Sequence, residues 1–251
     1  MYNSDDIKSL YEKFKLVQQK GWIKSFKKGS CGVGHTFENE IGKPIECMEL
    51  PDYKSIEIKT HKDNNSYPIG LFSALPSGNH EFETKYLVET YGKQNPNNKN
   101  CKSLRVVVNA LNIKRISDRF IFKLEIDRTS KKIFLIVLDN ELNIIDKSTY
   151  WNFDDLKIKL FRKMSTLALI EATSKFENYN VYFKYDKITF FYIKSFDSFI
   201  NSIENGKIQM TLNIATYKRN DGSIGINNHG TTFRIHIPDL PSIYTKINII
   251  T

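Results

Sequence analysis

The 251-residue sequence predicts a mixed α/β fold with an antiparallel C-terminal part. Three patterns support this prediction. Apolar residues recur at helical spacing over residues 4–20, they alternate with charged residues over 54–61, and the C-terminal third has β-branched runs separated by a tight turn. The length fits one large domain or two lobes of one compact unit. Because 40% of the residues are hydrophobic, the chain can bury a sizeable core and is not a disordered polymer.

Helices and strands alternate in the N-terminal half. The expected elements are a helix over residues 4–20, a glycine-rich stretch over 29–34, a short helix over 35–41 that Gly42 ends, a strand over 54–61, a loop over 64–79 and a helix over 81–91. Ser4 or Asp5 can cap the first helix, and Gly21 ends it. In the strand, Ile56 and Ile58 point into a core, while the charged residues between and beyond them lie on the other face.

The C-terminal half is richer in β-structure. The expected elements are strands over 104–110, 119–126 and 132–138, a helix over 154–164, strands over 167–173 and 182–193, a helix over 196–204, and a hairpin formed by 208–217 and 231–237. The hairpin turn contains Asn220-Asp221-Gly222, a sequence that favours reversal of the chain. The aromatic segment 179–192 fits a core sheet better than a base-stacking platform. The sequence contains no repeat, low-complexity tract or linker that separates independent domains.

Charge and cysteine content limit the classes of function. The formal net charge of +9 makes a polyanion such as DNA or RNA a reasonable partner, although an A/T-rich genome would also enrich lysine. Three widely spaced cysteines suggest neither a zinc site nor a disulfide scaffold, as expected of a reduced, intracellular protein. The longest uncharged apolar run, Ile133–Leu138, has six residues, and the N-terminus is acidic. The sequence therefore predicts a cytoplasmic protein with no signal peptide and no membrane partner.

The residues with the most specific chemistry are Asp52, Glu57 and Lys59. Strand alternation places Glu57 and Lys59 on one face, and Asp52, which follows Pro51 just before the strand, can turn its carboxylate to the same face. Two carboxylates suit Mg²⁺, which acidifies a bound water and stabilises charge on phosphorus, while a lysine holds the attacking water. The alternative is a solvated strand face with an ion pair. The same Glu-x-Lys spacing recurs at Glu83, in a predicted helix that no Pro-Asp precedes.

Two further segments accompany this candidate site. One reads Gly32-Val-Gly-His-Thr-Phe-Glu38, and the other reads Asn228-His-Gly-Thr-Thr-Phe-Arg234. With residues 51–59, they resemble the MvaI/BcnI family of type II restriction endonucleases, which has a Gly-x-Gly-x-Thr-Leu-Glu helix motif and an Asp-His-Gly-Thr-Ala-Phe-Arg motif. Phe37 replaces the usual leucine, and the uncharged Asn228 stands where an aspartate is usual.

The resemblance implies a restriction-endonuclease-like core of the PD-(D/E)xK type with a second lobe for DNA recognition. We expect the catalytic lobe in residues 1–165 and the recognition lobe, with a C-terminal β-hairpin, mainly in 166–251. The implied activity is Mg²⁺-dependent hydrolysis of double-stranded DNA at a short specific site, with Mn²⁺ as a substitute ion. The family also implies a monomer and a companion DNA methyltransferase that need not contact it. The alternatives are a MutH-like nickase of mismatch repair and a non-catalytic DNA-binding module.

The resemblance and the residue types together give the candidate site residues. The catalytic candidates are Glu38, Asp52, Glu57, Lys59 and His229, the metal ligands among them are Asp52, Glu57 and Glu38, and the DNA-binding candidates are His61, Lys218, Arg219, Asp221, Arg234, Lys27 and Lys28. Glu38 can bind a second metal, orient Lys59 or hold a metal-bound water. His229 can contact the scissile phosphate or protonate the leaving oxygen. Charged residues on the hairpin can read base edges, whereas the lysines before the glycine-rich stretch suit phosphate. The alternatives are a structural role for His229, an exposed helix carboxylate for Glu38 and an ordinary polar tip for the hairpin.

Overall fold

The computed structural model describes residues 2–29, 31–43, 50–63, 66–78, 80–96, 98–228 and 231–248. The chain divides into two compact units, each assembled from separate stretches of sequence. Unit 1 contains Met1–Ile69, Leu160–Lys194 and Ile243–Thr251, and unit 2 contains Gly70–Lys159 and Ser195–Ser242. The chain passes into unit 2 and returns to unit 1 twice, so each unit contains segments from both sides of residue 165.

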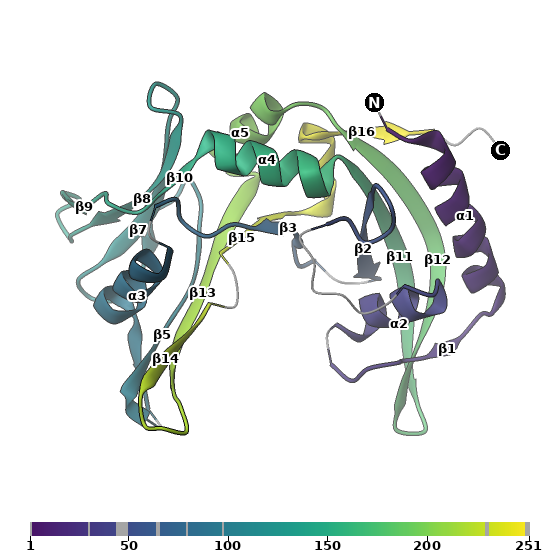
Figure 1. Cartoon of the computed structure of the whole chain (residues 1–251), viewed down its shortest axis with the longest axis horizontal. Helices are drawn as coiled ribbons and strands as arrows, with labels where there is room; N and C mark the ends of the chain where they lie inside the picture. The colour runs from purple at the N-terminus through teal and green to yellow at the C-terminus, as the bar shows by residue number, and fades with distance from the viewer. Residues whose placement is uncertain are drawn as a thin grey trace. The chain divides into compact units, whose positions relative to one another are not determined.

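In the described residues, unit 1 is built on a five-stranded sheet (Figure 1). Its strands are, in spatial order, β1 (Ile23–Lys24), β12 (Asn180–Ile193), β11 (Thr166–Glu177) and β2 (Ile56–Lys62), and β16 (Tyr244–Ile247) pairs with β12. β2 and β11 are parallel, with Lys59 opposite Leu169, whereas the other pairs are antiparallel. Helices α1 (Ser4–Gln19) and α2 (Gly32–Glu40) pack against this sheet.

The core of unit 1 follows from the periodicity of α1. This helix buries four apolar residues at helical spacing, namely Ile7, Leu10, Phe14 and Val17. They pack with apolar residues of α2, β2, β11 and β12, and each such burial contributes about 1.5–3 kcal/mol relative to exposure. The cap differs from the prediction, because the side chain of Asn3 accepts the backbone N–H groups of Asp5 and Asp6 at 3.0 and 3.2 Å.

Helix α2 begins at Gly32 rather than at residue 35, because Gly32 and Gly34 of the predicted glycine-rich stretch are helical. A Cβ at Gly32 would lie 2.6 Å from the carbonyl oxygen of Lys27, and a Cβ at Gly34 would lie 3.3 Å from Thr60 Oγ1. Neither glycine has a positive φ. These two glycines therefore allow α2 to pack closely on its own chain and do not form a tight turn. Gly42, with a φ of +73°, follows the helix as predicted.

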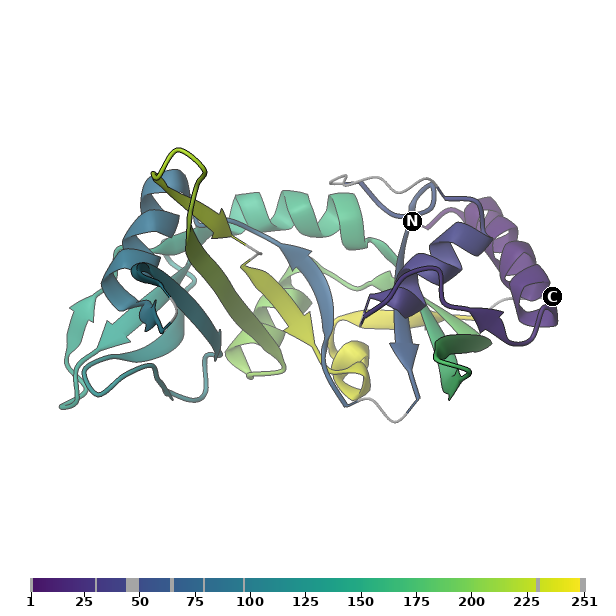
Figure 2. The same ribbon diagram turned by 90° about the horizontal axis from the view of Figure 1, so that it is seen from below.

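Within the described ranges, unit 2 contains two sheets (Figures 1 and 2). The six-stranded sheet has the order β3 (Ile69–Ser73), β15 (Thr232–Ile235), β13 (Ile208–Lys218), β5 (Asn98–Val108) and β4 (Lys93–Asn95), and β14 (Ile224–Asn228) also pairs with β13. The five-stranded sheet has the order β10 (Tyr150–Asn152), β8 (Lys132–Leu138), β7 (Ile121–Asp127) and β6 (Lys114–Arg115), and β9 (Ile144–Asp146) pairs with β8. The helical segments of this unit are α3 (His80–Tyr91), α5 (Phe196–Glu204) and η1 (Ile237–Ser242). Helix α4 (Phe153–Met164) begins in unit 2 and ends in unit 1.

Most predicted elements are confirmed, and the exceptions include α2, which begins earlier, and a strand that depends on a distant partner. Confirmed to within two residues are the helices over 81–91, 154–164 and 196–204 and the strands over 132–138 and 182–193. The predicted loop over 64–79 is wrong in part, because β3 forms there by pairing with β15, far along the chain. The C-terminal hairpin is larger than predicted, since β13 pairs with both β14 and β15. In the part of the chain that is described, no helix has the length and apolar character to cross a membrane.

Candidate active site

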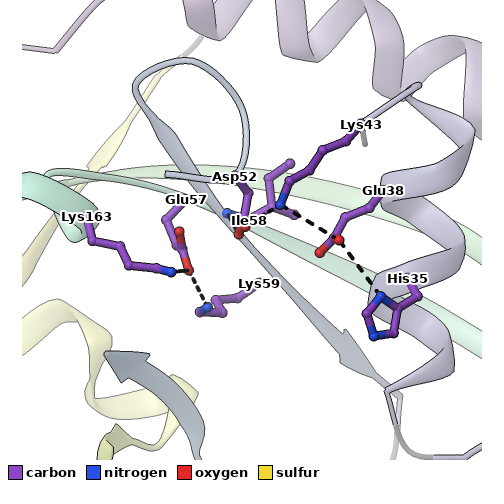
Figure 3. A network of polar contacts seen from close by, with 8 residues as sticks. All are labelled: His35, Glu38, Lys43, Asp52, Glu57, Ile58, Lys59 and Lys163. Atoms are coloured by element: carbon purple, nitrogen blue, oxygen red, sulfur yellow. Dashed lines mark hydrogen bonds and ion pairs between the residues drawn. The ribbon is translucent and has the colours of Figure 1, made fainter. Parts of the chain in front are cut away.

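Strand β2 carries two charged residues, Glu57 and Lys59, whose side chains meet (Figure 3). They alternate with Ile56 and Ile58 along the strand, so they lie on its other face. Glu57 is 1% exposed, and Lys59 Nζ lies 2.5 Å from its Oε1 atom. Lys163, in the last turn of α4, brings a second ammonium to 3.6 Å from the same oxygen. The predicted alternation is therefore confirmed, but the face is not solvated at Glu57, which is as buried as the isoleucines beside it.

Asp52 reaches the same place through a tight turn. Tyr53 and Ile56 exchange two backbone hydrogen bonds, and Lys54 between them has a φ of +51°. The turn folds Asp52 back along β2, where its Oδ2 atom accepts the backbone N–H of Ile58 at 3.0 Å. Its Oδ1 atom accepts a hydrogen bond from Lys43 Nζ at 2.5 Å. Because both oxygens have donors, the orientation of this carboxylate is defined by the protein itself.

Burial and neighbouring charges set the ionisation of the two carboxylates. Burial raises the pKa of Glu57 above its ordinary value, and the nearby lysines only partly oppose it. Burial also acts to raise the pKa of Asp52, but the hydrogen bond from Lys43 and the charge of Lys59 outweigh it and hold that pKa below its usual range. Burial acts to lower the pKa of Lys43, yet the hydrogen bond and charge of Asp52 raise it. The surroundings therefore favour the charged form of Asp52 and disfavour the charged form of Glu57.

Glu38 lies on α2 beyond Lys43 as seen from Asp52 (Figure 3). Its Oε2 atom is 3.8 Å from Lys43 Nζ and 4.0 Å from His35 Nδ1. Within the ranges that the structure describes, no three His, Cys, Asp or Glu side chains gather closely enough to hold a metal ion. The structure therefore places Glu38 next to the site, with a lysine between it and Asp52, and its role as a metal ligand stays a prediction.

Asp52 and Glu57 fit a hard divalent cation. Mg²⁺ usually binds through one or two carboxylates together with phosphate and water. Glu57 Oε2 is buried and has no hydrogen-bond partner among the described residues. Since native proteins rarely leave a buried polar atom unpaired, this oxygen suits a bound cation. A donor set of carboxylate oxygens favours Mg²⁺ or Mn²⁺ over metals that prefer sulfur or imidazole.

Comparison with known proteins identifies the family. The MvaI/BcnI restriction endonuclease family matches residues 11–244, nearly the whole chain. The chain belongs to this family. It is therefore a type II restriction endonuclease, a site-specific deoxyribonuclease, and the family, fold class and activity predicted from the motifs are confirmed.

Solved structures of the restriction endonuclease MvaI are similar to this endonuclease over the full chain. A complex of MvaI with its cognate DNA substrate is 31% identical, covers 99% of this chain and 100% of that chain, and has a TM-score of 0.89. MvaI in the absence of DNA is 30% identical, covers 100% of both chains and has a TM-score of 0.66. No curated protein sequence matches the chain. The similarity to MvaI shows that the two proteins share the mixed α/β fold.

The predicted DNA-binding residues of the endonuclease are divided between the units. Lys27 and Lys28 are exposed between β1 and α2, and His61 lies on β2 two residues after Lys59. The hairpin candidates all belong to unit 2, at the end of β13, in the turn after it and on β15, and they are Lys218, Arg219, Asp221 and Arg234. His229 lies outside the described residues.

The turn after β13 is ordered by its own side chains. Asp221 Oδ1 accepts the backbone N–H of Ser223 at 2.9 Å and its hydroxyl at 2.6 Å, and these hydrogen bonds hold the pKa of Asp221 below its usual range. A Cβ at Gly225 would lie 2.6 Å from the ring of Tyr217 and 2.9 Å from Arg219 Nε. The glycine therefore makes room for these two side chains, and Asp221, predicted as a base acceptor, already has a role in the turn.

Sequence reasoning missed Lys43 and Lys163. They come from the end of α2 and the end of α4, outside the segment that carries Asp52 and Glu57. The signal that could have found Lys43 is its place directly after Gly42, because a glycine that ends a helix fixes the next residue against the last turn. Lys163 carries no comparable signal, because basic residues are common in the last turn of helices.

Proposed function

We propose that this endonuclease hydrolyses phosphodiester bonds at a short specific site in double-stranded DNA, with Mg²⁺ as its cofactor and Mn²⁺ as a substitute. The observation that supports this most directly is the pairing of Lys59 with the buried Glu57 beside Asp52. The Asp52 carboxylate and the unpartnered Oε2 of Glu57 would hold the ion. When bound, the ion acidifies a water molecule and stabilises charge on the phosphorus.

Lys59 has the central role among the side chains. Its ammonium is held 2.5 Å from Glu57 Oε1, so it is positioned before the substrate arrives. From there it donates a hydrogen bond to the attacking water and adds positive charge beside the phosphoryl group. As the water oxygen bonds to phosphorus, the water gives up a proton to solvent and the bond to the leaving oxygen breaks. His229 is our candidate for the group that protonates that leaving oxygen. Lys163, 3.6 Å from Glu57, adds a second positive charge to the same site.

Reading of the DNA sequence belongs to unit 2. One face of its six-stranded sheet, here called the reading face, presents Gln209, Thr211 and Asn213 from β13. On the same face, Arg105 of β5 lies opposite Asn213, and Arg234 of β15 lies opposite Gln209. Among the described residues, the buried atoms Thr211 Oγ1, Asn213 Oδ1 and Arg234 Nε have no hydrogen-bond partner. Arginine pairs well with guanine, and asparagine or glutamine with adenine, so such a face suits base edges in the major groove.

Phosphate contacts complete this recognition. Lys218 and Arg219 extend from the end of β13, and Lys27, Lys28 and His61 lie in unit 1, which also contains Asp52, Glu57 and Lys59. Contacts of this kind fix the register of the protein on the duplex without reading its sequence. Each lysine that neutralises a phosphate increases the salt dependence of binding.

The endonuclease is proposed to act as a monomer, so that one active site cuts the two strands in turn. A companion DNA methyltransferase, which needs no contact with it, would protect the host site. Sedimentation of the protein with a short cognate duplex tests the monomer directly. One chain per duplex is the expected result, and two chains per duplex would contradict it.

Cleavage of unmethylated phage DNA tests the activity. The protein is incubated with Mg²⁺ or with EDTA, and the Lys59→Ala variant is incubated with Mg²⁺. Discrete bands that need both the ion and Lys59 support the proposal, and mapping their ends gives the site. A second assay uses supercoiled plasmid as the substrate. Its conversion to open circles alone would indicate a nickase. Binding in Ca²⁺ without any cleavage in Mg²⁺ would indicate a non-catalytic module.

A further inference from the structure

Lys43 joins two of the carboxylates near the site (Figure 3). Its Nζ atom lies 2.5 Å from Asp52 Oδ1 and 3.8 Å from Glu38 Oε2. The side chains of Lys43, Asp52 and Glu38 are only 14%, 16% and 21% exposed. We propose that Lys43 is a positioning residue that orients the Asp52 carboxylate, and that Glu38 acts on the site through Lys43 and not as a metal ligand. The inference rests on the proposed role of Asp52 in holding the ion.

The end of α2 fixes the place of Lys43. The N–H of Gly42 donates to the carbonyl of Asn39 at 3.0 Å, and the N–H of Lys43 donates to the carbonyl of Glu38 at 2.9 Å. Together with the φ of +73° at Gly42, these two bonds form a Schellman motif. An apolar contact often joins the two outer positions of this motif. Here the two positions are Lys43 and Glu38, and an ion pair takes the place of that contact.

Among the described residues, Lys43 supplies one of the two donors that hydrogen-bond to Asp52. The other is the backbone N–H of Ile58 on Oδ2, which any residue at position 58 except proline would provide. A carboxylate turns easily about its last torsion, so a single hydrogen bond leaves its second oxygen without a defined direction. Loss of the Lys43 side chain therefore affects Oδ1 and leaves the Ile58 contact in place. Groups that hydrogen-bond a metal-binding carboxylate in this way tune the site without touching the ion.

Glu38 is suited to act on Lys43. Its carboxylate faces the ammonium at 3.8 Å, and in the described part of the chain it forms no three-carboxylate group with Asp52 and Glu57. An ammonium with little exposure depends on the anions around it, so Glu38 helps to hold the Lys43 side chain in place. If this is its role, removing Glu38 has no further effect once Lys43 is gone.

A double-mutant cycle tests this dependence. Glu38→Gln is compared in the wild-type background and in Lys43→Met, with Mn²⁺ affinity measured by calorimetry in the absence of DNA and kcat measured on a short duplex. We expect Glu38→Gln to change both quantities in the wild type and neither in Lys43→Met, because residues that act as a unit are not additive. Equal weakening of Mn²⁺ binding by Glu38→Gln in both backgrounds would make Glu38 a ligand and overturn the proposal.

The role of Lys43 itself is tested by the conservative variant. Lys43→Met is expected to lower kcat by about 10- to 100-fold, the usual cost of removing a group that supports a metal ligand, and Lys43→Arg is expected to restore most of it. The matched control is Lys20→Met, since Lys20 also pairs with a carboxylate of α2, Glu40, at 2.6 Å but does not contact Asp52. Wild-type kcat in a folded Lys43→Met protein would sink the proposal.

Two further variants keep the outcomes distinct. If Lys43→Met does not fold, as judged by circular dichroism, Lys43→Gln takes its place in the cycle and retains a polar contact with Asp52. Asp52→Ala is assayed in parallel. Full cleavage by Asp52→Ala would contradict the proposed function of the site, whereas an inactive Asp52→Ala beside a fully active Lys43→Met would overturn the role of Lys43 alone.

Discussion

The candidate active site of unit 1 and one sheet face of unit 2 differ in how their buried polar groups are paired. At the candidate active site in unit 1, the charged groups pair with one another, Lys43 with Asp52 and Lys59 with Glu57. Among the described residues, Glu57 Oε2 is the unpaired carboxylate oxygen of Asp52 and Glu57. On the sheet face of unit 2, Asn213 Oδ1 and Arg234 Nε are buried and have no hydrogen-bond partner within the described residues. An unsatisfied buried group costs about 1–3 kcal/mol. The difference teaches that the chain preorganises its catalytic groups, whereas its proposed reading face needs a partner to be complete.

The largest expected effect comes from breaking the pairing in unit 1. Lys59→Ala should lower kcat by roughly 100- to 1000-fold, the loss typical of removing one group that stabilises developing charge. Binding of the cognate duplex in Ca²⁺ should stay within a few-fold of wild type, because the reading face is untouched. Single-turnover cleavage and a binding titration measure the two effects. Normal cleavage by a folded Lys59→Ala variant would remove this lysine from the mechanism.

The next effect tests the reading face of unit 2. Arg234→Ala should reduce discrimination between the cognate site and single-base variants by about 1–3 kcal/mol, the usual value of a bidentate base contact. Cleavage rates on a panel of duplexes measure it. Arg128→Ala is the control, because Arg128 pairs with Asp197 and Glu204 at the surface of the same unit. Unchanged site choice in Arg234→Ala would exclude Arg234 from base readout.

The free energy of unfolding distinguishes a paired polar group, Asp52, from an unpaired one, Asn213. Asp52→Asn should lower the free energy of unfolding by about 1–2 kcal/mol, because it removes the charge that Lys43 contacts. Asn213→Val should leave it unchanged or raise it, since valine has no unpaired oxygen and favours a strand. Urea unfolding of both variants provides the test. A larger loss in Asn213→Val than in Asp52→Asn would mean that the oxygen of Asn213 is satisfied in the protein.

The smallest effect concerns a carboxylate of unit 2 that is paired. Asp146 Oδ2 accepts hydrogen bonds from the hydroxyls of Tyr86 and Tyr91 at 3.0 and 2.7 Å. Burial acts to raise its pKa, but the hydrogen bonds hold the pKa below the ordinary 3.8. A carboxyl with a lowered folded pKa stabilises the fold above its unfolded pKa and loses that contribution as the pH falls through the folded value.

Asp146→Asn should therefore be less stable than the wild type near pH 7, and the difference should shrink as the pH falls below 3.8. Urea unfolding at a series of pH values compares the two proteins. A constant difference across the series would show that the contribution of Asp146 does not depend on its charge. In that case, the ion pairs of the active site would be the better supported example of stability that depends on charge.

Local patterns predicted the elements whose contacts depend on spacing within one segment. The burial of Ile56 and Ile58 follows from strand alternation, and the buried face of α1 follows from helical periodicity. The same alternation placed Glu57 and Lys59 together. It did not predict that Glu57 would be buried, because burial depends on the chain segments that cover β2.

The elements that were missed depend on partners far away in the sequence. β3 is a strand because β15 pairs with it. Lys163 reaches Glu57 from the end of α4, more than a hundred residues later in the chain. A search for sequence motifs cannot detect this contact, because the residue types around Glu57 carry no information about Lys163.

The sequence by itself determined the mixed α/β class, the family and the trio of Asp52, Glu57 and Lys59, because these depend on residue types at fixed short spacings. The tertiary structure decided the surroundings that give the trio its properties. It set the opposite pKa shifts of Asp52 and Glu57 and the ion pair with Lys43, because burial and Coulomb interactions act through space between segments that the chain order does not bring together.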